Sequence, residues 1–461
     1  MKSSTGEVGK PLSDTKGTPL RFVTGSSLFD GHDAAINMIR RLLQSQGAEV
    51  IHLGHNRSVQ ELVDAAIQED ADGLAVSSYQ GGHNEFFKYM VDELKANNAG
   101  HIQVFGGGGG VILPSEIEAL QAYGVNRIYS PQDGQKMGLE GMIGDMIARA
   151  AQVRDARKKA EVTCTPEGIK ALANNWPLLT QLITRLERDE VAAADLEAIR
   201  EQAKASKTPV LGITGTGGAG KSSLTDELIR RLRMDHGDDL TIGVVCVDPS
   251  RRKTGGALLG DRIRMNAIGP WAGNGPKVFM RSLATRDSAQ EVPATLPDII
   301  ALCRATGFDV VLIETPGIGQ GDAAIVPHVD FSLYVMTPEY GAASQLEKID
   351  MLDFADFVAV NKFDRKGALD ALRDVCKQVQ RNRMAFTSMP DTMPVYGTLA
   401  SRFNDDGVSA LYKALRAALP IAKPSKGLFD SIDTKHSTTM KAVVPSERVR
   451  YLAEIAQAVR S

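Results

Sequence analysis

The chain is predicted to be an α/β protein with a flavodoxin-like (Rossmann-type) unit, a helical linker and a P-loop nucleotide-binding unit. Two observations predict this architecture. Short apolar runs alternate with amphipathic stretches in both halves of the 461 residues, which is typical of parallel sheets covered by helices. A phosphate-binding signature, Gly215-Thr216-Gly217-Gly218-Ala219-Gly220-Lys221-Ser222, follows one apolar run and opens a helical pattern.

The composition is that of an ordinary globular protein of two or three domains. Hydrophobic residues make up 43% of the chain, and the net charge of −3 argues against nucleic-acid binding. No run of about 18 apolar residues occurs, so no membrane span is expected. The cysteines form no C-x-x-C pair, which predicts free thiols and a cytoplasmic location; they are Cys164, Cys246, Cys303 and Cys376.

The first unit is expected to span 20–146, after a flexible tail over 1–19. Its candidate strands are 21–23, 49–53, 73–77, 103–105 and 127–129, with helical patterns at 34–46, 59–68, 85–96 and 115–122. Five strands with this spacing suit a flavodoxin-like domain, whose ligands bind beyond the C-terminal ends of the strands.

Residues 147–207 are rich in Ala, Glu, Lys and Arg, with apolar residues at helical spacing, and predict a helical linker. A second α/β unit is expected over 208–420. Its candidate strands are 209–213, 241–247, 310–313, 331–335 and 357–360. Residues 421–461 turn polar and end in an amphipathic stretch at 446–461, which we expect to lead toward a further domain.

The P-loop signature predicts a nucleotide site. Its glycines let backbone N–H groups point at phosphate oxygens, Lys221 neutralises the β and γ phosphates, and the Ser222 hydroxyl ligates Mg²⁺. Asn361-Lys362-Phe363-Asp364 follows another apolar run, and Asp364 can accept two hydrogen bonds from guanine that adenine cannot offer. GTP or GDP is therefore the expected nucleotide. The residues assigned to it are Gly215, Gly217, Gly218, Ala219, Gly220, Lys221, Ser222, Ser223, Gly317, Asn361, Lys362 and Asp364.

Three carboxylates are candidates for the magnesium side of this site. Glu314-Thr315-Pro316-Gly317 follows a strand, where Glu314 can hold Mg²⁺ through a water and the Gly317 N–H can reach the γ-phosphate. A surface turn made by Pro-Gly is the alternative. Asp248 closes a strand and Asp261 follows a glycine-rich loop, although a solvated acidic residue is the default interpretation of each.

The block from Val247-Asp248-Pro249-Ser250 through Thr254-Gly255-Gly256 to Gly260-Asp261-Arg262-Ile263-Arg264-Met265 resembles the metallochaperone branch of P-loop GTPases, which serves cobalamin-dependent acyl-CoA mutases. Glu314 to Gln320 matches that branch as well. The resemblance implies that Asp248, Asp261 and Glu314 surround Mg²⁺ together with Ser222. It also implies that Arg264 belongs to a switch loop, so the expected catalytic set is Lys221, Glu314 and Arg264.

Asp30-Gly31-His32 follows the first candidate strand. In an extended segment, residues two apart point the same way, so the carboxylate can fix the histidine tautomer and leave the other ring nitrogen to a metal. Without further context, an Asp-x-His pair more often consists of solvated loop residues. Glycine-bearing loops end two neighbouring strands, at 77–83 and 106–110, and would leave a slot for a large flat cofactor.

Residues 20–146 resemble the cobalamin-binding domain of adenosylcobalamin mutases. The resemblance implies that His32 ligates cobalt, with Asp30 behind it and Gly31 between them. It implies that Ser77, Gly106 and Gly107 line the pocket for the cofactor's nucleotide tail. Two residues depart from the family pattern: Ala35 stands where glycine is usual, and Tyr79 alters the serine loop.

The order of the units resembles the N-terminal part of the fused isobutyryl-CoA mutases. That resemblance implies a mutase barrel as partner, in the same full-length chain or in a separate subunit, because the residues after 420 are too few for a barrel of about 250 residues. Acyl-CoA would bind only through the barrel, and a homodimer is expected. A chain with both sites but no barrel should bind adenosylcobalamin and hydrolyse GTP without isomerising acyl-CoA. The alternatives are a cobalamin-binding carrier or switch acting in trans, and a GTPase whose first unit binds another ligand.

Overall fold

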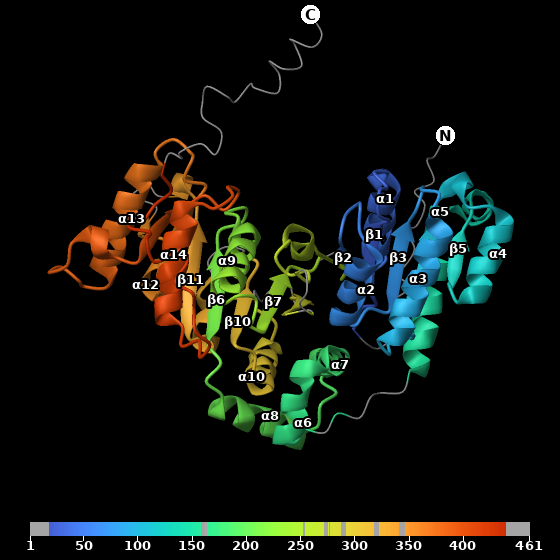
Figure 1. Cartoon of the computed structure of the whole chain (residues 1–461), viewed down its shortest axis with the longest axis horizontal. Helices are drawn as coiled ribbons and strands as arrows, with labels where there is room; N and C mark the ends of the chain where they lie inside the picture. Colours follow the sequence, from blue (N-terminus) through green and yellow to red (C-terminus); the bar gives the residue numbers. More distant parts are fainter. Residues whose placement is uncertain are drawn as a thin grey trace, which may run out of the picture.

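The computed structural model describes residues 18–438 apart from 158–161, 163, 252–253, 272–274, 276, 287–291, 318–321 and 341–345. Residues 1–17 of the expected tail, the motif residues 318–320 and the amphipathic stretch 446–461 therefore lie outside the described residues. Two α/β units stand side by side (Figure 1). The linker helices run beneath both units: α6 (Pro166–Ala171), α7 (Trp176–Glu187) and α8 (Ala193–Ala205).

The first unit is built on a parallel sheet with the order β5-β4-β3-β1-β2-β8. Its first five strands confirm the predicted flavodoxin-like order: β1 (Arg21–Ser26), β2 (Glu49–His52), β3 (Gly73–Ser77), β4 (Gln103–Gly107) and β5 (Arg127–Tyr129). The sequence pattern predicted these strands because each is almost entirely buried around a short apolar run.

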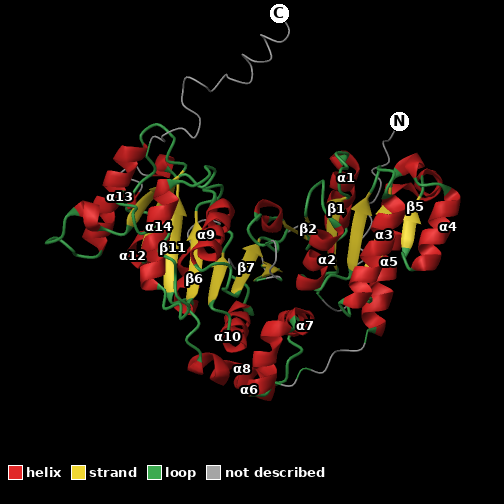
Figure 2. Ribbon diagram, in the orientation of Figure 1, coloured by secondary structure: helices red, strands yellow, loops and turns green. Residues whose placement is uncertain are grey.

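Helices cover both faces of this sheet (Figure 2). Leu43 of α1 (Asp33–Ser45) and Ile143 of α5 (Pro131–Ala156) pack with Phe22 and Phe105 on one face. The other face is covered by α2 (Val59–Gln68), α3 (His83–Ala96) and α4 (Pro114–Tyr123). Helix α5 runs through residue 146, the expected end of the unit. None of the described helices is both long and apolar enough to cross a lipid bilayer.

The second unit has a seven-stranded parallel sheet with the order β13-β12-β11-β6-β10-β7-β9. Its strands are β6 (Val210–Gly215), β7 (Ile242–Asp248), β9 (Val278–Ala284), β10 (Val310–Glu314), β11 (Phe331–Met336), β12 (Phe357–Asn361) and β13 (Val395–Thr398). Helices α9 (Lys221–Asp235) and α14 (Asp406–Ala418) pack on one face. Helix α10 (Leu296–Thr306) covers the other with the linker helices, while α12 (Met351–Phe354) and α13 (Ala368–Asn382) extend the cover over β11 and β12.

One strand of the second unit belongs to the sheet of the first. Strand β8 (Ala257–Leu259) pairs in parallel with β2, in the register Glu49↔Ala257, Val50↔Leu258 and Ile51↔Leu259. No strand was predicted here from the sequence, because three residues between glycines are too short to show a strand period. The two units therefore share a hydrogen-bonded sheet.

A buried cluster of charges lies where the two units and the linker meet. Arg286 pairs with Glu49 at 2.8 Å and with Glu187 at 2.8 Å, while Arg262 donates to Glu69 at 3.1 Å. The side chains of Glu49, Glu69 and Glu187 are at most 4% exposed. Because breaking a buried pair leaves an uncompensated charge, this cluster fixes the two units together at their base.

Candidate functional site

The P-loop runs from the end of β6 into the first turn of α9, as the sequence predicted. Gly220 is the N-cap of α9 and has a φ of 90°, in the left-handed region that favours glycine. A Cβ at this position would lie 2.6 Å from Nδ2 of Asn361, the last residue of β12. The glycine thus allows the guanine-side loop to contact the P-loop directly.

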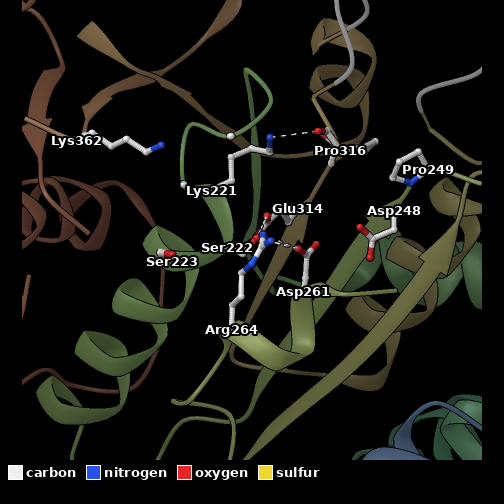
Figure 3. Close-up of a pocket in the computed structure, with 13 residues that line it drawn as sticks. Lys221, Ser222, Ser223, Asp248, Pro249, Asp261, Arg264, Glu314, Pro316 and Lys362 are labelled. Carbon is white, nitrogen blue, oxygen red and sulfur yellow. Dashed lines mark hydrogen bonds and ion pairs between the residues drawn. The ribbon is translucent and has the colours of Figure 1, made fainter. Parts of the chain in front are cut away.

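A cavity of about 420 Å³ lies over the start of α9 (Figure 3). It brings together many of the predicted residues: Gly218, Gly220, Lys221, Ser222, Ser223, Asp248, Asp261, Arg264, Glu314 and Lys362. Lys221 Nζ donates to the carbonyls of Gly215 at 2.9 Å and Pro316 at 3.2 Å. The ammonium group is therefore held between the P-loop and the segment after β10, where Gly317 lies.

Ser222 joins two of the predicted carboxylates. Its hydroxyl lies 2.9 Å from Asp261 Oδ1 and 2.8 Å from Glu314 Oε1, and its single proton serves one of them at a time. Thr225, one turn along α9, donates to Glu314 Oε2 at 2.8 Å. Sequence reasoning missed Thr225, although its position three residues after Ser222 placed it on the same face of the helix. Asp248 Oδ2 accepts the Gly260 N–H at 3.1 Å.

Burial raises the pKa values of all three carboxyl groups, and repulsion from neighbouring carboxylates adds to this for Asp248 and Glu314. Burial, and then the charges of Asp261 and Glu314, raises the pKa of Asp248 to about 8. Burial and Asp261 raise the pKa of Glu314 to about 7, and burial raises that of Asp261. Two carboxylates that share the Ser222 hydroxyl, with a third lining the same cavity, form an oxygen donor set that fits a divalent cation.

No group of three or more His, Cys, Asp and Glu side chains is arranged to hold a metal by itself in the part of the chain that the structure describes. The oxygen donor set at the P-loop fits Mg²⁺ better than a structural metal, because Mg²⁺ is usually bound by one or two carboxylates together with nucleotide phosphates and water. Arg264 is the exposed member of the set: its side chain is 65% exposed and lies 3.9 Å from Asp261.

The end of β12 and the loop after it carry the guanine-side residues. Asn361 is 2% exposed; its Nδ2 donates to the Ala219 carbonyl at 2.7 Å, and its Oδ1 accepts the Ala400 N–H at 3.1 Å. Lys362 has a φ of 59°, which is strained for a residue with a side chain, and it lines the cavity. Asp364 lies exposed in the next turn, outside the residues that line the cavity.

In the first unit, the structure brings Asp30 and His32 together after β1. Asp30 is fully buried, and its Oδ1 lies 2.9 Å from His32 Nδ1, whereas the imidazole is 69% exposed. The other carboxylate oxygen accepts the Tyr79 N–H at 2.8 Å. The Tyr79 ring lies 5.2 Å from the imidazole centroid. This arrangement fixes the ring and leaves Nε2 as the nitrogen that can meet a metal.

A largely apolar cavity of about 460 Å³ opens beside α1 and the ends of β3 and β4. Ser77, Gly106 and Gly107 line it, as predicted, together with Ala35 and Tyr79, the two departures from the family pattern. Asp30, Gly31 and His32 are not among its lining residues. A Cβ on Gly106 would approach Phe87 and Ile128 to 2.5 Å, so core packing by itself requires glycine there.

Comparison with known proteins places these two sites in a family context. Residues 179–451 match the family model "Methylmalonyl Co-A mutase-associated GTPase MeaB", and residues 20–131 match the model "B12 binding domain". Similar curated proteins are the fused isobutyryl-CoA mutases of Cupriavidus metallidurans (63% identical over 444 residues), Nocardia farcinica (56% over 448) and Geobacillus kaustophilus (53% over 459). Each match covers 96% of this chain and 40% of the relative.

The expected resemblance to the N-terminal part of the fused mutases is therefore confirmed, and the chain spans two fifths of the length of these relatives. The cobalamin-binding assignment of the first unit agrees with its family model. The GTPase assignment agrees with the model that covers more than half of the chain. The chain belongs to the family of methylmalonyl-CoA mutase-associated GTPases (MeaB), with a B12-binding domain ahead of the GTPase.

Proposed function

We propose that this chain binds adenosylcobalamin and hydrolyses GTP as the cofactor-and-chaperone portion of an acyl-CoA mutase that interconverts isobutyryl-CoA and n-butyryl-CoA. One observation carries the proposal: a histidine fixed by a buried carboxylate caps the helix that lines an apolar cavity, on the same chain as a P-loop with three clustered carboxylates. The 63% identity to a fused isobutyryl-CoA mutase supports the choice of substrate.

In the cobalamin-binding unit, His32 Nε2 would ligate cobalt while Asp30 holds the proton on Nδ1. Ser77 and Gly107, beside the cavity of about 460 Å³, would line the pocket for the nucleotide tail. Adenosylcobalamin, when bound, supplies the radical chemistry of carbon-skeleton rearrangement. The role of the chain is to hold the cofactor in one orientation.

In the GTPase unit, the P-loop amides and Lys221 would bind the phosphates, and Asp364 would select guanine. Ser222, Asp248, Asp261 and Glu314 would hold Mg²⁺, directly or through water. Arg264, which is largely exposed, would act from a switch loop that orders around the γ-phosphate. Hydrolysis would thereby gate the loading or protection of the cofactor.

The partner in this proposal is a substrate-binding mutase barrel, in the same full-length chain or in a separate subunit. Acyl-CoA would contact that barrel alone. We propose a homodimer in the cytoplasm, where the four cysteines, all free and buried, would stay reduced.

The test is a visible absorption spectrum of the purified chain mixed with adenosylcobalamin. Ligation by His32 predicts a spectrum distinct from that of the free cofactor, and His32→Ala should abolish the change. His55→Ala is the matched control, because His55 is also exposed and lies outside the cavity lining. A spectrum identical to that of free cofactor would contradict the cobalamin assignment. The GTPase assignment would be contradicted if the chain did not hydrolyse GTP, or if Lys221→Ala hydrolysed it as fast as the wild type.

A further inference from the structure

The segment between Asp248 and Asp261 connects the two proposed sites. Both carboxylates line the nucleotide cavity, and β8 lies between them. On one side, the segment closes on itself where the Gly260 N–H donates to Asp248 at 3.1 Å, and Asp261 meets Ser222 at 2.9 Å. On the other side, β8 is hydrogen-bonded to β2 of the cobalamin-binding unit. One short stretch of chain therefore contacts both units.

The same segment seats the C-terminal end of helix α1, and Gln44 is the centre of that contact. The Gln44 carbonyl accepts from Thr254 Oγ1 at 3.3 Å. Its side-chain oxygen, oriented to meet the surrounding donors, accepts from Arg251 Nε at 3.1 Å and the Leu258 N–H at 3.0 Å. Gln44 is only 2% exposed. The last turn of α1 is thus bonded to the GTPase through main-chain and side-chain atoms.

Gly256 makes this close approach possible. A Cβ at position 256 would lie 2.3 Å from the Gln44 carbonyl oxygen and 2.8 Å from that of Ala48. Both neighbours are main-chain atoms at the junction of α1 and β2, so neither can move aside as a flexible side chain would. Any side chain at this position must push the segment away from α1.

The other end of α1 belongs to the cobalamin site. His32 is the N-cap residue of the helix. The first turns carry cavity-lining residues, namely Ala34, Ala35, Ile36, Met38 and Ile39. A helix of 13 residues spans about 20 Å, and its residues are joined by continuous backbone hydrogen bonds. A displacement of the helix at Gln44 would therefore also displace the cavity wall and the proposed cobalt-ligating position.

We infer that residues 254–261 tether helix α1 to the nucleotide site, so that the nucleotide bound to the GTPase sets the placement of α1, with Gln44 and Gly256 as positioning residues for cobalamin binding. The inference rests on the proposed function of both sites. The buried charge cluster at the base, with Arg286 on Glu49 and Arg262 on Glu69, keeps the units joined while this short strand shifts.

The test measures adenosylcobalamin affinity by absorbance titration of the full chain, saturated with Mg²⁺ and either GDP or the imido analogue of GTP. The coupling factor is the ratio of the two dissociation constants. We expect a factor of about 5 or more for the wild type, within the usual range of coupling between two sites. Linkage requires the same factor to appear when nucleotide affinity is measured with and without cobalamin.

Gly256→Ala should bring the coupling factor close to 1 while both ligands still bind. Gln44→Met, which keeps the volume but removes the amide, should lower the factor without inserting an atom at the contact. Gly269→Ala is the control: a Cβ there meets nothing within 4 Å, so its factor should equal that of the wild type. Circular dichroism of each variant establishes that it is folded.

The outcomes separate the inference from the function it rests on. A wild-type factor of 1, with both ligands bound, would overturn the tether and leave both binding sites standing. Wild-type coupling retained in folded Gly256→Ala and Gln44→Met would also overturn it. Absence of any cobalamin binding would contradict the proposed function itself, and the tether with it.

Discussion

The side-chain amide of Asn361 donates to the main-chain carbonyl of Ala219 at 2.7 Å, and so joins two loops that are 142 residues apart in the sequence. The same amide oxygen accepts the N–H of Ala400 and the hydroxyl of Thr398. Asn361 thus holds together the P-loop, the guanine-side loop and the loop after β13. The nucleotide pocket depends on one buried side chain that need not touch the nucleotide.

Asn361→Ala should weaken GDP binding roughly tenfold or more, because buried groups left without partners each cost about 1–3 kcal/mol. Isothermal titration calorimetry measures the loss. Asn382→Ala, which removes a half-exposed amide from the end of α13, should bind GDP as the wild type does. Equal affinity of Asn361→Ala and wild type would show that the three loops keep their places without it.

Asp364→Asn should exchange guanine for xanthine. The carboxylate accepts hydrogen bonds from the guanine N1–H and 2-amino group, whereas an amide offers a donor to the 2-oxo group of xanthine. Competition between GDP and XDP for the site measures the exchange. Asp374→Asn, which changes a residue of α13 that does not line the cavity, should leave the preference for guanine unchanged. A variant that still prefers GDP would move base recognition away from Asp364.

Asp30→Asn should lower cobalamin affinity by about 10- to 100-fold, the usual cost of losing the carboxylate behind a metal-binding histidine. The amide keeps the volume of the buried side chain but withdraws the charge that orients His32 Nδ1. Absorbance titration gives the affinity, and Asp33→Asn, an exposed neighbour in the first turn of α1, is the control. Identical titrations for Asp30→Asn and wild type would leave Asp30 with a purely structural role.

The buried charge cluster at the junction of the two units should stabilise the fold less in acid. Burial alone would raise the pKa of Glu187, but Arg21, Arg281 and Arg286 outweigh it and lower the pKa to about 2. The pKa of Glu187 in the folded chain lies below the ordinary value of 4.5. The ionised side chain therefore stabilises the folded state above pH 4.5, and this contribution to the free energy of unfolding is lost as the pH falls toward 2.

Thermal unfolding between pH 5 and pH 2.5 measures this effect. Glu187→Gln should be less stable at neutral pH by about 3–5 kcal/mol, because buried arginines lose their partner, and its midpoint should depend less steeply on pH. Glu197→Gln, on the exposed side of α8, should follow the wild-type curve. Parallel curves for wild type and Glu187→Gln would assign the acid sensitivity to other groups.

The parts of the fold that the sequence predicted correctly share one property: local apolar runs. The five strands of the first unit and the linker helices all follow from hydrophobic periodicity. Strand β9 did not, because Arg281 interrupts it, and that side chain is 1% exposed in the structure. An arginine in an apolar run indicates a solvated position. The structure shows instead that Arg281 is paired with Glu187, 94 residues earlier in the chain.

The candidate-site residues that could be predicted from the sequence are likewise those whose signal is local. Local motifs predicted the P-loop, Asn361 and the Asp30–His32 pair, because the chemistry of each is carried by adjacent residues. The junction residues Gln44 and Gly256 were not predicted, since their contact joins segments more than 200 residues apart. Gly256 was noted only as part of a glycine-rich loop. Glycine is needed at this position because any Cβ would collide with the carbonyl oxygens of Gln44 and Ala48 in the first unit.

Strand β8 has a consequence for synthesis of the protein on the ribosome. The edge of β2 emerges about 200 residues before the strand that covers it. At roughly 5–20 residues per second, that edge stays open for about 10–40 seconds of translation. Exposed strand edges invite pairing with other chains, so this interval is when the nascent chain is most vulnerable to aggregation. A chain cut between β2 and β8 would carry the same open edge permanently.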